Sequence, residues 1–169
     1  GKWSGRNRIV FSRLLCNLLS RMNRGVEKLS EGKLQGQVLS DFKSFFDEES
    51  LGGLGERARS AKDGVLSEGR HRVVVLDFEK NGKRLKVAVK AFGRQGFLKD
   101  LYDFKKGSKA ERSFKAANFL KSRGVGTPQP IAYFDCWEGS RLVESFYLSD
   151  YLESLVSFKS ALIHAYQER

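Results

Sequence analysis

Cysteine is scarce in this chain, which has only Cys16 and Cys136 among its 169 residues. The two lie far apart, and the sequence contains neither a C-x-x-C pair nor a Cys/His cluster. This usage fits a reducing compartment and argues against a structural zinc site. Runs of about 18 to 20 apolar residues, which a membrane-spanning helix requires, are also absent. We therefore expect a cytoplasmic protein.

Motifs for nucleophilic catalysis are missing as well. His71 accompanies no Ser or Cys nucleophile motif, and no Asp follows His164 at the spacing of a catalytic loop, so nothing supports a hydrolase. The segment Gly52–Gly55 is glycine-rich, but no strand pattern precedes it and the G-x-x-x-x-G-K-[ST] order is absent. We interpret this segment as a flexible hinge.

Acidic residues are outnumbered, with 20 Asp and Glu against 31 Lys and Arg and a net charge of +11. Such an excess favours anionic partners without choosing among them. Residues 9–22 predict an amphipathic helix flanked by arginines. Two interpretations stay open: residues 6–24 contact an anionic membrane surface, the inner membrane, peripherally, or the helix packs on protein.

A second helical pattern is predicted after this helix. Its apolar stripe comprises Val38, Leu39, Phe42, Phe45 and Phe46, and acidic residues close the segment. Aromatic stripes at this spacing usually belong to a core. We expect residues 1–63 to form a basic, α-helical amino-terminal extension.

Strand patterns begin at Gly64. They cover Val65–Leu66, Arg72–Phe78, Lys83–Phe92, Ile131–Trp137 and Leu142–Leu148. Asn81-Gly82 predicts a hairpin between the second and third strands. A helix is predicted from about Lys109 to Arg123, ended by Gly124, and the two prolines in Thr127–Pro130 lead the chain back to the sheet in an extended path. For residues 64–152 we expect an α+β fold with a five-stranded antiparallel sheet.

The predicted strand Lys83–Phe92 contains the candidate nucleotide-binding residues. Alternation places Ala88 and Lys90 on one face, where a small residue leaves room for a flat base and a compact cation can reach phosphates. Glu111, near the start of the next helix, is positioned to hold the lysine. Ser108-x-x-Glu111 is also a capping box, and both roles remain open for the glutamate.

Three segments, 83–92, 106–114 and 124–134, together resemble the amino-terminal lobe of the lipopolysaccharide core kinases, the Kdo/heptose kinase family with its protein-kinase-like fold. The resemblance covers roughly Gly64–Leu155. It implies that Lys90 is the phosphate-orienting lysine and Glu111 its helix-C partner. By position, Gly69 and Arg70 replace the glycine-rich loop, and the backbone of Ser149, Asp150, Tyr151 and Leu152 holds adenine beside Ala88.

The implied activity is ATP-dependent phosphorylation of an inner-core sugar hydroxyl, on Kdo or heptose, of the lipopolysaccharide or lipid A core glycolipid. Magnesium would accompany ATP, but the catalytic Asp and the metal ligands of such kinases lie in a carboxy-terminal lobe. Neither motif occurs here, so we expect residues 153–169 to be a helix leading to a missing lobe. This chain alone would bind nucleotide without turnover.

The alternative is a non-catalytic, pseudokinase-like adaptor that binds an anionic membrane or an acidic partner. A basic-aromatic segment at residues 94–107 is also typical of nucleic-acid contacts. No recognised nucleic-acid motif accompanies it, so we do not expect a nucleic-acid partner.

Overall fold

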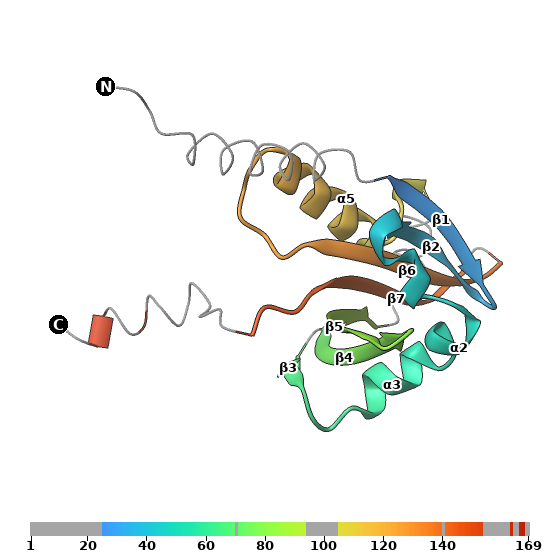
Figure 1. Ribbon diagram of the computed structural model, residues 1–169, viewed down its shortest axis with the longest axis horizontal. Coiled ribbons are helices and arrows are strands. Elements are labelled where there is room, and N and C mark those ends of the chain that lie inside the picture. Colours follow the sequence, from blue (N-terminus) through green and yellow to red (C-terminus); the bar gives the residue numbers. More distant parts are fainter. Residues whose placement is uncertain are drawn as a thin grey trace.

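The computed structural model describes residues 25–69, 71–93, 105–139, 141–153, 163, 166 and 167. It is an α+β structure built on one seven-stranded antiparallel sheet in the order β1-β2-β6-β7-β5-β4-β3 (Figure 1). The strands are β1 (Val26–Glu31), β2 (Leu34–Leu39), β3 (Val65–Ser67), β4 (Arg72–Lys80), β5 (Lys83–Phe92), β6 (Pro130–Glu138) and β7 (Arg141–Asp150). The predicted class is confirmed, whereas the predicted number of five strands is wrong.

The two additional strands, β1 and β2, form a hairpin that joins the sheet through β6. Val38 and Leu39 therefore end a strand, and the helix predicted to begin there is wrong for both. Consecutive residues of a strand point to opposite faces, and here both faces are covered. Val38 lies in the main core, which also contains Val89 and Phe134. Leu39 lies on the other face, in a smaller cluster with Phe92, Ala110, Phe114 and Tyr133. In the sequence, two adjacent buried apolar residues look like the start of the apolar face of an amphipathic helix. The expected helical extension thus does not describe residues 26–39.

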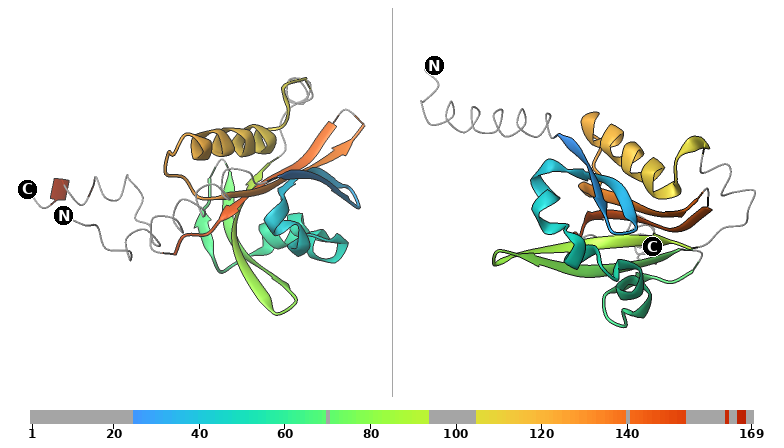
Figure 2. Two further views of the ribbon diagram at one scale, coloured as in Figure 1. Left: turned by 45° about the horizontal axis from the view of Figure 1, so that its top comes forward. Right: turned by 90° about the vertical axis from the view of Figure 1, so that its right-hand side faces the viewer.

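Two layers of helices enclose the sheet. The 3-10 helix η1 (Ser40–Phe45) is followed by α2 (Glu48–Leu51) and α3 (Leu54–Ser60), and α5 spans Lys109–Ser122. Figure 2 shows α3 on one side of the sheet and α5 on the other. Leu51, Leu54 and Ala58 bury themselves against the central strands on the α3 side, where the main core lies. Phe114 of α5 packs on the opposite face.

The glycine-rich segment is not the flexible hinge that we expected. Gly53 adopts a left-handed conformation, with φ of +70°, as the residue preceding α3. Gly55 is buried inside α3, where an added Cβ would lie 2.7 Å from Oε1 of Glu144. The glycines therefore permit a sharp helix start and a close helix–sheet contact.

Local signals elsewhere are confirmed. Asn81 and Gly82 have φ of 52° and 72° and join β4 to β5 in register, as a tight hairpin turn requires. Gly124, with φ of +74°, follows the end of α5. Pro130 begins β6, as the extended proline segment predicts.

Several predictions fall outside the described residues. These are the helix at 9–22, the loop at 94–104, Arg70, and most of the helix at 153–169. Among the helices that the structure does describe, none combines the length and the hydropathy needed to cross a bilayer.

Asp47 links α2 to the hairpin strand β4. Its carboxylate accepts a hydrogen bond from the backbone N–H of Ser50 (2.9 Å) and pairs with Lys80, and these bonds, the Lys80 bond first, lower the pKa of Asp47 to about 2. A carboxyl whose pKa is lower in the folded state stabilises that state above its unfolded pKa of about 3.9. This contribution is lost as the pH falls toward 2.

Asp47→Asn keeps a helix-capping side chain but removes this titration. We expect the melting temperature of the variant to lie below that of the original protein at pH 6, and the difference to shrink between pH 4 and pH 2. Thermal unfolding followed by circular dichroism across this range measures it. A difference in melting temperature that is the same at every pH would contradict the lowered pKa of Asp47.

Candidate functional site

The face of β5 that α5 covers carries the predicted nucleotide residues. Val87 and Val89 are fully buried on the opposite face, in the main core. Ala88 and Lys90 are half-buried, and Phe92, two residues beyond Lys90 on the same face, packs with Phe114 of α5. The alternation that the sequence predicts for β5 is therefore present.

Lys90 lies among aromatic side chains. Its Nζ is 5.3 Å from the centroid of the Phe92 ring, and its cross-strand neighbours are Val73 on β4 and Tyr147 on β7. Burial raises the pKa of Tyr147 to about 12, although a hydrogen bond with Ser149 acts in the opposite direction. The phenol therefore stays neutral beside the lysine. A cation over a ring on a half-buried face is held in position and does not extend freely into solvent.

Glu111 forms its ion pair elsewhere. Its backbone N–H donates to Oγ of Ser108 (2.9 Å), which is the serine half of a capping box. Its carboxylate accepts from Nζ of Lys115 (2.6 Å), one helical turn onward, and lies over the α-carbon of Gly107. Between the described residues Lys90 and Glu111 there is no ion pair. The structure thus places both predicted residues on the α5 side of the sheet without joining them.

The predicted adenine-binding segment begins inside β7. Ser149 is the cross-strand partner of Ala88, so the strand end lies directly beside the small residue. The N–H groups of Asp150 and Tyr151 already donate, to the carbonyl oxygens of Gln129 (2.8 Å) and Lys86 (3.3 Å). A base bound here would therefore need the N–H of Leu152 or a carbonyl group of this segment as its backbone contact.

The turn between β3 and β4 is exposed. A Cβ added at Gly69 would meet no atom of the described residues within 4 Å, so packing against them does not demand glycine there. Glu68 and Arg72 form an ion pair across this turn. The neighbouring Arg70 lies outside the described residues.

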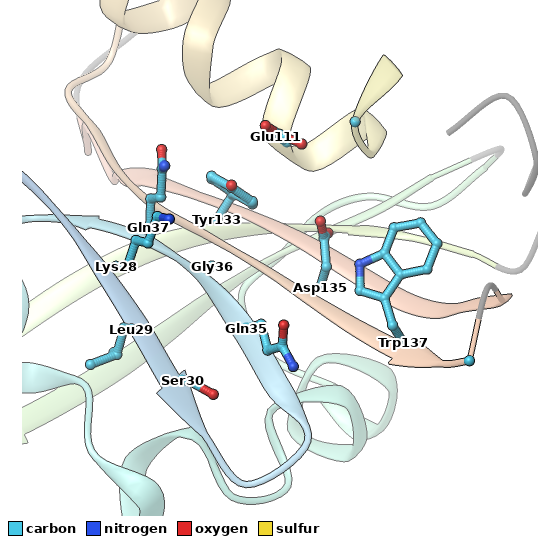
Figure 3. A pocket seen from close by; sticks show the side chains of 12 residues that line it. Lys28, Leu29, Ser30, Gln35, Gly36, Gln37, Glu111, Tyr133, Asp135 and Trp137 are labelled. Carbon is cyan, nitrogen blue, oxygen red and sulfur yellow. The ribbon is translucent and has the colours of Figure 1, made fainter. Parts of the chain in front are cut away.

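A cleft of about 730 Å³, which was not predicted from the sequence, lies between the β1–β2 hairpin, β6 and the start of α5 (Figure 3). Its lining includes the side chains of Lys28, Ser30, Gln35, Gln37, Glu111, Tyr133, Asp135 and Trp137. On each strand these residues alternate with residues of the opposite face. This alternation is visible in the sequence of each strand. It identifies a single surface only after the three strands have been aligned.

No known protein family, curated protein or solved structure matches this chain. Within the described ranges, no three His, Cys, Asp or Glu side chains come together as a metal site. Two surfaces on the α5 side are therefore the candidate sites: the Ala88–Lys90 face and the cleft.

Proposed function

We propose that this chain is the nucleotide-binding lobe of an ATP-dependent kinase, and that the complete enzyme phosphorylates an inner-core sugar hydroxyl of lipopolysaccharide. In this proposal Lys90 orients the ATP phosphates, Ala88 accommodates the base, and the backbone after β7 holds its edge. Magnesium arrives with the nucleotide and is held by residues that this chain does not supply. The sugar-bearing acceptor, a lipid A core glycolipid, belongs to the complete enzyme.

One observation carries the proposal: Lys90 lies on the sheet face that α5 covers, and α5 comes after the Lys90 strand and before β6 in the chain. Protein kinases place their phosphate-binding lysine on a strand and pair it with a glutamate of the following helix. Ala88 and Ser149 lie side by side on the same two central strands. One surface thus contains Ala88, which would accommodate the base, Lys90, which would reach the phosphates, and the end of β7, which would hold the edge of the base.

The role of Glu111 requires a rearrangement. Its carboxylate must leave Lys115 before it can reach Lys90, and the Lys115 pair is an exposed i,i+4 contact. Such pairs contribute only about 0.3–0.5 kcal/mol. Bound phosphate that draws Lys90 toward it would therefore compete with a weak interaction. In kinases the corresponding lysine–glutamate pair forms in the active state.

The experiment is calorimetric titration of the full chain with a non-hydrolysable ATP analogue and magnesium. We expect weak binding that Lys90→Ala reduces by about ten- to a hundredfold, because a charge-assisted hydrogen bond to phosphate is worth about 1.5–3 kcal/mol. Glu111→Ala should weaken binding less, since the glutamate acts only through the lysine.

Lys83→Ala is the matched control. It removes the same charge from the same strand, but at the exposed hairpin end away from Ala88. Equal losses in both lysine variants would mean non-specific charge attraction. A folded protein that binds no nucleotide, also when extended by any downstream lobe, would leave the adaptor alternative.

A further inference from the structure

We propose that the cleft between the β1–β2 hairpin, β6 and α5 binds a neutral saccharide. Its volume of about 730 Å³ lies within the range of about 300–1,000 Å³ typical of small-molecule sites. Saccharide binding here does not require nucleotide binding, because none of the described residues proposed to contact the nucleotide lines the cleft. Tyr147 lies between the cleft residue Tyr133 and Lys90 in one cross-strand row. The two sites can therefore be tested separately.

The floor of the cleft is built from two polar rows that cross three strands. Lys28 faces Gln37, which faces Tyr133 on β6. The parallel row runs from Ser30 through Gln35 to Asp135. Apart from Tyr133, whose ring packs in the smaller cluster with Phe114, the side chains of these two rows contribute nothing to an apolar core. They instead offer amide, hydroxyl and carboxylate groups to a ligand that both donates and accepts hydrogen bonds.

Two aromatic residues flank Asp135 on the same face of β6. Tyr133 is mostly buried, with its ring 5.5 Å from that of Phe114, and Trp137 is half-buried at the opposite end of the cleft. Figure 3 shows Tyr133, Asp135 and Trp137 in line, facing Glu111 across the cleft. A sugar ring presents an apolar C–H face to an aromatic surface and hydroxyls at its edge. An aromatic–carboxylate–aromatic line matches both features.

The Asp135 carboxylate is fixed in place. It is buried, with 4% of its surface exposed, and Oδ1 accepts a hydrogen bond of 2.7 Å from the buried hydroxyl of Ser145. A carboxylate held this way loses little side-chain freedom when it binds a hydroxyl. The pair places a rigid acceptor between the two aromatic side chains.

The charged side chains of the cleft are few. Among the described residues that line it they are Lys28, Glu111 and Asp135, and Glu111 already pairs with Lys115, although the whole chain carries a net charge of +11. Burial, with smaller contributions from the two carboxylates, raises the pKa of Tyr133 above its ordinary value. The phenol thus remains a hydrogen-bond donor at neutral pH. A phosphate or sugar acid needs several cationic donors, which the described lining does not offer, whereas a neutral polyol needs only the hydrogen-bonding groups present there.

The test uses maltohexaose, cellohexaose, mannohexaose and chitohexaose as probes. Trp3→Phe leaves Trp137 as the remaining tryptophan of the chain, so indole fluorescence reports on the cleft directly. We expect at least one probe to change this fluorescence saturably at concentrations up to about 10 mM, with calorimetry giving the same Kd. Trp137→Ala should weaken the calorimetric binding at least about tenfold.

Because Trp137→Ala also removes packing, Gln35→Ala provides a second variant. Gln35 is exposed on β2, so its loss should leave the melting temperature unchanged while weakening binding about three- to tenfold. Gln167→Ala removes an equally exposed amide outside the cleft and should bind as the original protein does. Spermidine, a polycation, tests whether the cleft attracts ligands only through the charge of its carboxylates.

The outcomes are decisive in both directions. Saccharide binding that falls in Trp137→Ala and Gln35→Ala but not in Gln167→Ala supports the proposal, whether or not the ATP analogue binds. Folded protein that binds none of the four oligosaccharides overturns it. Binding that is unchanged in the cleft variants, or binding of spermidine alone, overturns it too.

Discussion

Gly36→Ala is expected to detach the β1–β2 hairpin from the sheet. An added Cβ would overlap the carbonyl oxygen of Tyr133 and lie 2.8 Å from its carbonyl carbon and 3.0 Å from the α-carbon of Phe134. These are backbone atoms of β6, a strand paired on both sides, so they cannot move aside as a flexible side chain would. Overpacking of this kind costs about 1–3 kcal/mol, and we expect the upper end.

Urea denaturation and amide hydrogen exchange measure this effect. In Gly36→Ala the amides of β1 and β2 should exchange faster, while those of β4 and β5 keep their protection, because among the described strands the hairpin pairs with the rest of the sheet through β6 alone. Gly126→Ala is the control, since a Cβ there meets nothing within 4 Å. Uniform loss of protection across the sheet, or no loss at all, would contradict the expectation.

The same variant separates the two proposed sites. Loss of the hairpin removes Gln35 and Gln37 from the cleft but leaves Ala88 and Lys90 in place. Saccharide binding should therefore disappear while binding of the ATP analogue persists.

Phe134→Ala should be the most destabilising of the substitutions considered. Phe134 is fully buried at the centre of the sheet, and its ring lies 5.6 Å from that of Phe46, on the segment between η1 and α2. Truncating a buried phenylalanine costs about 3–5 kcal/mol, because the transfer energy is lost and a cavity remains. Against a total stability of about 5–15 kcal/mol, this loss is a large fraction.

Urea denaturation at 25 °C measures the change as a shift in midpoint at constant slope. Phe119→Ala is the matched control: the same side chain is removed from α5, where 58% of it is exposed and its ring lies 5.1 Å from the Arg123 guanidinium carbon. We expect the control to lose less than about 1 kcal/mol. Similar losses in the two variants would mean that Phe134 does not anchor the core.

Part of the candidate site was predictable because its signals are local. The alternation of Lys83–Phe92 already places Ala88 and Lys90 on one face, and the Asn81-Gly82 turn sets the register of their strand. Glu111 shows the limit of such reasoning. Its capping serine is adjacent in sequence, whereas the choice between Lys115 and Lys90 depends on how α5 lies over the sheet.

The sequence by itself determined the elements whose causes lie within a few residues: the β4–β5 hairpin, the bounds of α5 and the extended approach to β6. Only the tertiary structure decided that residues 26–39 complete the sheet and that Gly36 touches the β6 backbone. The strand β1 is half exposed and has little apolar alternation, so its stability comes from pairing with distant residues. The cleft has the same origin, because its polar rows exist only after β1, β2 and β6 are aligned.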